Sequence, residues 1–111
     1  MGVSLDSLQK AIHEMAKEKG WWEEERGFAE VIALAHSELS EALEEYRDGK
    51  GMLYYNEDNP NKPEGIGIEM ADVIIRILDW AEHADVDIEE MIRLKFNYNA
   101  TRPYKHGGKK I

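Results

Sequence analysis

The sequence predicts an all-α domain, a helical bundle of about four helices in a single domain over residues 1–111. Apolar residues recur every three or four positions through most of the chain, and no stretch alternates convincingly with a period of two. The length of 111 residues suits one ordinary domain, and a hydrophobic content of 42% is too high for a disordered chain.

The first two predicted helices each have an apolar stripe and recognisable ends. One spans residues 5–19, with Ser4 as its N-cap and Gly20 beyond its last turn. Its stripe consists of Leu5, Leu8, Ile12 and Met15. The other spans residues 28–48 and ends at Gly49, and its stripe consists of Phe28, Val31, Ile32, Ala35, Leu39, Ala42, Leu43 and Tyr46.

The helical periodicity disappears between Gly49 and Pro63. Asparagine, proline and glycine are frequent there, which indicates a connection that is long for a helical bundle. Ordered loops of this length often carry function. We therefore expect either a cover over a site or a flexible linker.

Two further helices follow this connection. The third spans residues 64–84 and, together with the second, is expected to form the centre of the bundle. The fourth begins at a capping-box-like pair, Asp87 and Glu90, and ends near Asn99 or Thr101.

Composition excludes several classes of protein. The net charge of −9, from 23 acidic and 14 basic side chains, argues against binding a nucleic-acid polymer, because that affinity comes mostly from neutralising phosphates. The absence of cysteine excludes thiol catalysis and thiolate zinc sites, and is compatible with the cytoplasmic location that we expect. No apolar run approaches the roughly 18 residues of a membrane span, so no membrane partner is expected.

The charge is unevenly distributed, since residues 93–111 form a basic tail without any acidic residue. Such a tail could help to hold a metal–polyanion complex against the acidic body. A solvated tail that offsets self-repulsion is the interpretation that charge alone favours.

The third helix is apolar around most of its circumference, which is typical of a helix buried on nearly every side. One narrow polar stripe interrupts it, formed by Glu69, Asp72, Arg76, Asp79 and His83. Either this stripe faces solvent or it lines an internal polar site, and the helix alone does not separate these alternatives.

The second helix favours an internal site. Glu38 lies within the edge of its apolar sector, and Glu41 lies beside it one turn further along. Glu38 and Glu41, like Glu69 and Asp72, are spaced i and i+3, so that each pair projects from one face. If the two faces meet, four carboxylates converge.

Four carboxylates cannot share a bundle interior without a compensating charge, because burial and repulsion both oppose their ionisation. Hard oxygen ligands without cysteine or histidine suit Mg²⁺, Mn²⁺ or Ca²⁺. A diiron site would need the motif Glu-x-x-His on two helices. None of the four histidines has Glu three positions earlier, which argues against such a site; they are His13, His36, His83 and His106. Single Glu-x-x-Glu pairs are common on exposed helices, so the prediction depends on finding two facing pairs.

Three segments resemble the signature of the MazG-like, all-α nucleoside triphosphate pyrophosphohydrolases. Residues 36–44 read HSELSEALE and residues 67–75 read GIEMADVII, which is similar to the family's Glu-x-x-Glu and Glu-x-x-Asp helices. Residues 98–109 read YNATRPYKHGGK and resemble the tail of small members. The resemblance covers about residues 5–109.

This resemblance implies hydrolysis of a ribo- or deoxyribonucleoside triphosphate to the monophosphate and pyrophosphate, in the cleansing of nucleotide pools. It implies Mg²⁺ as cofactor, with Mn²⁺ as the alternative, bound by Glu38, Glu41, Glu69 and Asp72. Glu41 is our choice for the catalytic proton acceptor, with Glu38 as the second catalytic candidate. A homodimer or homotetramer is also implied, with sites completed by a neighbouring subunit.

Substrate contacts are predicted from the basic tail and from a tryptophan pair. The candidates for the triphosphate and sugar are Lys95, Asn99, Arg102 and Lys105. Adjacent Trp21 and Trp22 offer a stacking face for a base, although most tryptophans of small bundles belong to the core. The lysines and the arginine are equally compatible with exposed surface positions.

Two other functions stay open at this stage. One is a non-catalytic helical module whose acidic face docks a basic partner. The other is a related pyrophosphohydrolase that acts on phosphoribosyl-ATP or another diphosphate-containing substrate.

Overall fold

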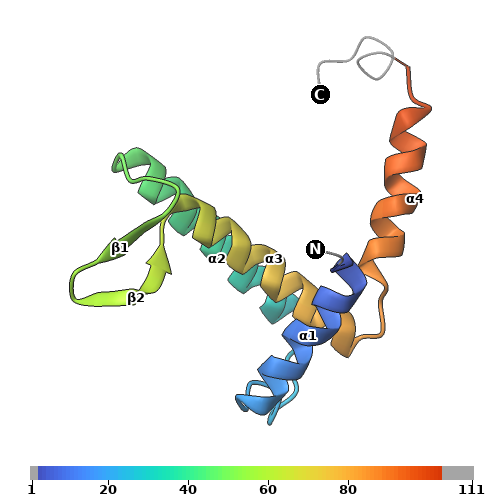
Figure 1. Ribbon diagram of the computed structural model, residues 1–111. Helices are drawn as coiled ribbons and strands as arrows, with labels where there is room; N and C mark the ends of the chain where they lie inside the picture. The colour runs from blue at the N-terminus through green and yellow to red at the C-terminus, as the bar shows by residue number, and fades with distance from the viewer. Residues whose placement is uncertain (1–2, 104–111) are drawn as a thin grey trace.

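A computed structural model, which describes residues 3–103, contains four α-helices and one two-stranded β-hairpin in that part of the chain (Figure 1). In chain order the elements are α1 (Leu5–Glu18), α2 (Phe28–Arg47), β1 (Tyr54–Asn56), β2 (Asn59–Glu64), α3 (Ile66–His83) and α4 (Ile88–Ala100). The predicted mostly helical fold is confirmed, and each helix boundary lies within about two residues of the expected one.

Helices α2 and α3 form a long antiparallel pair, and α1 crosses the end of this pair where α3 finishes (Figure 1). The apolar core lies between these three helices. Its buried side chains are Ile12 from α1, Val31, Ala35 and Ala42 from α2, and Ile66, Val73, Leu78 and Ala81 from α3. Small residues on α2 and α3 let the two helices approach closely, which brings their polar edges together.

Two helix starts form as their sequences predict. The side chain of Ser4 accepts a hydrogen bond from the Ser7 amide at 3.0 Å, and that of Asp87 accepts one from the Glu90 amide at 3.0 Å. These bonds satisfy amides that have no partner inside the helix. The side chain of Glu90 pairs with Arg93.

The connection between α2 and α3 contains regular structure that the sequence analysis did not predict. Strands β1 and β2 pair antiparallel, with Tyr54 opposite Glu64 and Asn56 opposite Asn59. β2 is almost entirely exposed, so neither of its faces needs apolar residues. The hairpin therefore leaves no alternating pattern in the sequence, and the expectation of a connection without strands was wrong.

Gly65 ends the hairpin in a conformation that only glycine adopts easily. Its φ is 127°, and a β-carbon there would lie 2.4 Å from the carbonyl oxygen of Met52. This close approach lets the amides of Ile66 and Gly67 donate to the carbonyl oxygens of Gly51 and Met52, at 3.1 and 3.0 Å. The base of the hairpin is thereby fixed to the first turn of α3.

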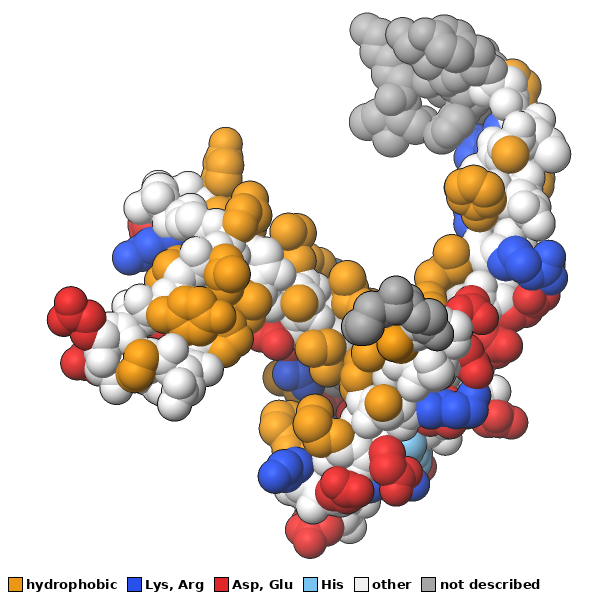
Figure 2. Space-filling model, viewed as in Figure 1, with side chains coloured by type: hydrophobic (Ala, Val, Ile, Leu, Met, Phe, Trp, Pro, Cys, Tyr) orange, Lys and Arg blue, Asp and Glu red, His pale blue; other side chains and the backbone are white. Residues whose placement is uncertain are grey.

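Helix α4 does not complete the expected four-helix bundle. It has no buried residue, it packs mainly along the start of α1, and it projects away from the α2–α3 pair (Figure 1). The radius of gyration is 17.0 Å, compared with about 13 Å for a compact domain of this length. Hydrophobic side chains are consequently exposed along the α2–α3 pair and along α4 (Figure 2).

Among the described residues, no helix combines the length and the apolar character that a membrane span requires.

Candidate functional site

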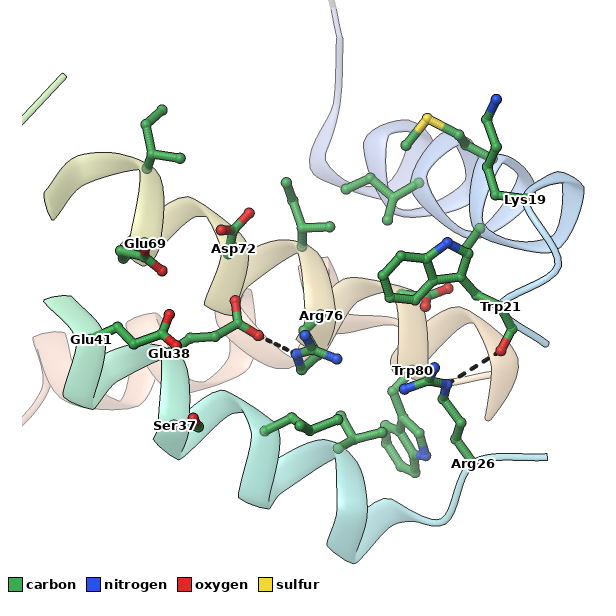
Figure 3. Close-up of a pocket in the computed structure, with 18 of the residues that line it drawn as sticks. Lys19, Trp21, Arg26, Ser37, Glu38, Glu41, Glu69, Asp72, Arg76 and Trp80 are labelled. Carbon is green, nitrogen blue, oxygen red and sulfur yellow. Dashed lines mark hydrogen bonds and ion pairs between the residues drawn. The ribbon is translucent and has the colours of Figure 1, made fainter. Parts of the chain in front are cut away.

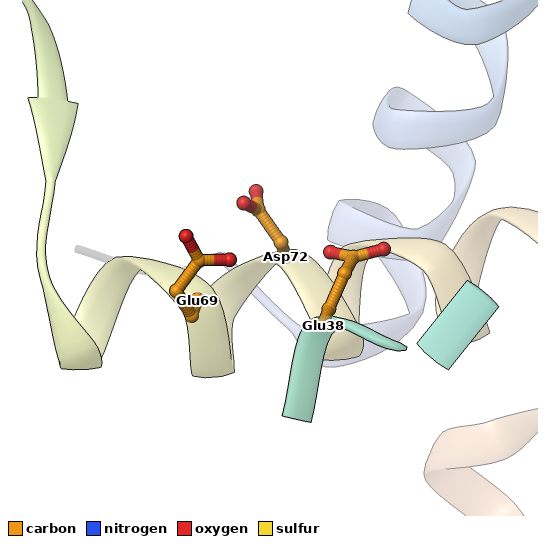
Figure 4. A group of neighbouring side chains, drawn as sticks. All are labelled: Glu38, Glu69 and Asp72. Atoms are coloured by element: carbon orange, nitrogen blue, oxygen red, sulfur yellow. The ribbon is translucent and has the colours of Figure 1, made fainter. Parts of the chain in front are cut away.

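Carboxylates of α2 and α3 meet at the polar edge of the helix pair. One carboxylate oxygen each from Glu38, Glu69 and Asp72 lies within 4.8 Å of the others (Figure 4). The i, i+3 spacing places Glu69 and Asp72 on one face of α3, and the antiparallel packing brings Glu38 of α2 opposite that face. Glu38 and Glu69 are half-buried, and Asp72 is exposed.

Glu41, the fourth predicted carboxylate, is coupled to this group through Glu69. The pKa of Glu69 is raised from 4.5 to about 7. Partial burial is the largest cause, followed by the charge of Glu41 and a hydrogen bond between the two side chains. The charges of Asp72 and Glu45 act in the same direction. The raised pKa of Glu69 indicates an excess of negative charge at this position.

One cation lies against the carboxylates. The guanidinium of Arg76 pairs with Glu38, and both side chains are largely shielded from solvent. Among the ion pairs of residues 3–103, this is the only one that involves Glu38, Glu41, Glu69 or Asp72. Arg76 therefore neutralises part of the cluster and leaves the Glu69 side without a fixed positive partner.

The sequence analysis placed Arg76 on the polar stripe of the third helix and gave it no role. Its position one turn beyond Asp72 was the available signal. The pairing with Glu38 depends on how α2 and α3 are aligned, and this alignment cannot be read from either helix alone.

Glu45 extends the acidic surface toward the hairpin. The hydroxyl of Tyr54 donates a hydrogen bond to Oε1 of Glu45 at 2.9 Å, which ties β1 to α2. Its other oxygen, Oε2, is buried and has no hydrogen-bond partner among the residues that the structure describes.

The carboxylates line one end of a cavity of about 720 Å³, which runs between α1, α2, α3 and the end of β2 (Figure 3). Glu38, Glu41, Glu69 and Asp72 gather at one end, and Trp21, Trp80, Arg26 and Lys19 lie at the other. The cavity is therefore acidic at one end and aromatic and cationic at the other. Its volume suits a small organic ligand.

Trp21 and Trp22 have different environments, a difference that the sequence left undecided. Trp21 is 51% exposed and lies on the cavity wall, with the guanidinium of Arg26 at 5.4 Å from its ring centre. Trp22 is half-buried, donates its indole N–H to Asp79, and stacks on His83 with ring centres 4.0 Å apart. Trp21 is thus the more accessible surface for a planar ligand.

The substrate contacts predicted on α4 are not brought to the carboxylates within one chain. Lys95, Asn99 and Arg102 lie on or just after α4, and none of them lines the cavity. Lys95 and Arg102 instead lie near the ring of Tyr98, at 4.9 and 5.9 Å from its centre. Lys105, the fourth predicted contact from the tail, lies outside the described residues.

The sequence analysis also missed cations that line the cavity. Lys19 and Arg26 come from the segment between α1 and α2, and Lys62 comes from β2. Lys19 is the last residue of the predicted first helix and lies outside its apolar stripe, and Arg26 and Lys62 lie outside the predicted helices, so helical spacing gave no signal for them.

The donor set fits a hard divalent cation. Carboxylate oxygens of three residues lie within 4.8 Å of one another, and the pKa of Glu69 is raised by burial and then by its acidic neighbours. A doubly charged ion at this position would relieve the repulsion. Oxygen ligands of this kind suit Mg²⁺, Mn²⁺ and Ca²⁺ alike, so the group by itself does not select among them.

Comparison of the chain with models of protein families, with curated proteins and with solved structures found no match. The resemblance to MazG-like enzymes therefore depends on the three sequence segments that carry it.

Proposed function

We propose that this protein is a Mg²⁺-dependent nucleoside triphosphate pyrophosphohydrolase of the MazG-like, all-α type. The observation that carries the proposal is the polarity of the cavity, with carboxylates of α2 and α3 at one end and Trp21 with Arg26 at the other. A nucleoside triphosphate has the matching chemistry, because its phosphates require a metal ion and its base is planar. Hydrolysis to monophosphate and pyrophosphate would serve nucleotide-pool cleansing in the cytoplasm.

Glu38, Glu69 and Asp72 would hold the cation, with Glu41 as the fourth ligand or the proton acceptor. A bound divalent cation supplies charge neutralisation on the phosphates and acidifies a coordinated water. Arg76 holds Glu38 in place from the opposite side, so that its carboxylate is oriented before ligand binding.

The proposed reaction transfers one proton and breaks one phosphoanhydride bond. A water oxygen attacks the α-phosphorus, the bond from that phosphorus to the bridging oxygen breaks, and pyrophosphate leaves with that oxygen. Glu41 accepts the proton of the attacking water. Its contact with Glu69, whose pKa is raised to about 7 chiefly by burial and then by the charge of Glu41, supports this role, because Glu69 can take up a proton near neutral pH.

Helix α4 supports a homodimer or homotetramer as the working form. Ile88, Ile92, Lys95 and Asn99 follow one another at intervals of three or four residues and so lie on one face of α4, and Arg102 follows just after the helix. That face is apolar at its start and basic or polar at its end. If its apolar part docks on a second copy, the basic end reaches the same copy, where the acidic cluster is complementary in charge.

A product analysis tests the enzymatic proposal. The protein is incubated with Mg²⁺ and a panel of ribo- and deoxyribonucleoside triphosphates, and the products are identified by ³¹P NMR. Monophosphate and pyrophosphate are expected. Orthophosphate alone would indicate a different phosphohydrolase, and turnover of only phosphoribosyl-ATP would favour the related enzyme. Metal binding without turnover of any substrate would favour an interaction module with an acidic docking face.

The oligomer has a separate test. Phe96 is 68% exposed on α4, so Phe96→Glu should cost a monomer little. Light scattering after gel filtration should show an oligomer for the natural sequence and a smaller species for this variant, with Arg93→Gln as the control. A natural sequence that elutes as a clean monomer would contradict the proposed assembly.

A further inference from the structure

The aromatic end of the cavity depends on a segment that lacks regular structure. Residues 19–27 connect α1 to α2 without forming a helix or strand, and they contribute Lys19, Trp21 and Arg26 to the cavity. Ordering each residue of such a segment costs about 1–2 kcal/mol of backbone entropy. The position of these three side chains must therefore be fixed by specific contacts to the helices.

Trp22 makes several of those contacts, besides the hydrogen bond from the Trp21 amide to the carbonyl oxygen of Ala16 at 3.0 Å and the ion pair of Arg26 with Glu30. Its indole Nε1 donates to both carboxylate oxygens of Asp79, at 2.9 and 3.1 Å. Its ring stacks on His83 with ring centres 4.0 Å apart and planes 16° apart, and it meets His13 edge to face with ring centres 5.4 Å apart. Trp22 thus fastens the segment to α1 and α3; both tryptophans line the cavity, and the adjacent Trp21 is the more exposed of the two.

Asp79 joins three parts of the chain through one carboxylate. Besides binding Trp22 of the connecting segment, its Oδ1 lies 2.7 Å from Nδ1 of His13 on α1. The Asp79 side chain is only 17% exposed, and hydrogen bonds to a shielded charged acceptor are stronger than those between neutral groups. Loss of this acceptor would leave an indole N–H without a partner on the inner side of the segment.

The position of Asp79 on α3 fixes its distance from Asp72 along the helix axis. Asp79 follows Asp72 by seven residues, which is two helical turns and about 10 Å along the axis. Both residues lie on the same polar stripe of α3. One rigid helix therefore carries the metal-binding carboxylate and the group that fixes the aromatic wall, and it holds them at a constant separation.

We propose that Asp79 is a positioning residue that fixes Trp22, and through it Trp21 and Arg26, at the distance from the carboxylates that a nucleoside triphosphate spans. This inference rests on the proposed function for the identity of the ligand. Asp79 acts through Trp22, because both of its oxygens are already engaged by that indole. Its contribution concerns the nucleoside part of the ligand, and the phosphates bind at the other end.

Two variants separate this role from general stability. Asp79→Asn keeps the size of the side chain and loses the charged acceptor, and Trp22→Phe removes the N–H donor while it keeps a ring beside His83. Asp85→Asn is the matched control, since it removes an exposed carboxylate just beyond the same helix. Thermal unfolding by circular dichroism shows whether each variant is folded at the assay temperature.

Calorimetry then measures two ligands in the presence of Mg²⁺: a nucleoside triphosphate analogue that resists cleavage between the α- and β-phosphates, and inorganic tripolyphosphate. Because Asp79→Asn removes the charge of the acceptor and Trp22→Phe removes the donor of the same hydrogen bond, we expect the Kd of the analogue to rise up to about tenfold in both variants, and more in Trp22→Phe. The Kd of tripolyphosphate should stay within about twofold. Unchanged affinity for the analogue, or equal weakening of both ligands, would overturn the proposal.

A ligand-free measurement tests the anchor itself. Trypsin cuts after Lys19 and Arg26 in the connecting segment and after Lys50, which is exposed between α2 and β1. Both variants should be cut faster in the segment relative to Lys50, and an unchanged ratio would overturn the anchoring role. If the natural sequence binds neither phosphate ligand, the proposed function fails, and the trypsin ratio still decides whether Asp79 holds the segment.

Discussion

Glu69→Gln should stabilise the metal-free protein at pH 8. The pKa of Glu69 is raised from 4.5 to about 7, chiefly by burial and then by the charge and hydrogen bond of Glu41, so its ionised form is unfavourable in the folded state. The neutral amide has a similar shape and carries no charge. Removing this charge relieves the repulsion with Glu41 and Asp72.

The size of this effect follows from the shift. Each tenfold change in an ionisation constant corresponds to about 1.4 kcal/mol, which sets a ceiling of about 3 kcal/mol for Glu69. Because the side chain is only half-buried, solvent screening reduces the expected gain in unfolding free energy to about 1 kcal/mol. For a domain of this size, that gain raises Tm by about 4–8 °C.

The pH dependence has a definite sign. Between pH 4.5 and about 7 the folded protein binds the Glu69 proton more tightly than the unfolded chain does, so this residue's contribution to stability falls as the pH rises through that window. The difference between variant and natural sequence should therefore be small at pH 4.5 and large at pH 8.

Thermal unfolding by circular dichroism, in buffers with a chelator at both pH values, measures this difference. Glu57→Gln is the control, because Glu57 is exposed in the turn of the hairpin. A Glu69→Gln variant that melts no higher than the natural sequence at pH 8, or a gain of equal size at pH 4.5, would refute the assigned repulsion. Glu38→Gln should not stabilise the protein, because the amide would leave Arg76 without its charged partner.

Three further predictions concern separate parts of the molecule. Asp72→Asn should lower kcat by at least about 100-fold while circular dichroism shows a native fold, and unchanged turnover would remove Asp72 from the proposed ligands. Gly65→Ala should lower the free energy of unfolding, measured in urea, by about 2–4 kcal/mol, because the new β-carbon would meet the Met52 carbonyl. Gly51→Ala should have a much smaller effect, because no atom lies within 4 Å of a β-carbon at that position. Asp87→Ala should weaken the start of α4 by about 1 kcal/mol, seen as roughly fivefold faster amide hydrogen exchange there; unaltered exchange would contradict the cap.

The helices were predictable because each has local signals. Periodic apolar residues and side-chain caps at Ser4 and Asp87 depend only on neighbours in the sequence, and the structure reproduces them. The hairpin lacks such a signal, since β2 pairs through its backbone and is exposed on both faces. The position of α4 was equally inaccessible, because its apolar stripe predicts packing without specifying against which surface.

In the cluster of carboxylates, too, local spacing was predictable and contacts between helices were not. The spacing of Glu69 and Asp72 places both on one face of a helix, and this could be deduced locally. The contact of Arg76 with Glu38 depends on the relative alignment of two helices, which is a property of their packing. For Trp21 and Trp22, which both line the cavity, adjacent identical residues gave no basis for deciding which ring would be engaged by the helices and which would be more exposed.

The first turn of α3 has a consequence for how anions are recognised. Exposed amides at a helix start commonly cradle phosphate. In this chain, the amides of Ile66 and Gly67 are already occupied by the carbonyl oxygens of Gly51 and Met52. If the protein binds a polyphosphate as proposed, these two amides do not contribute, and binding depends mainly on side chains and on the ion that they hold. Ligand affinity should then follow metal concentration more closely than in proteins that bind phosphate through the backbone.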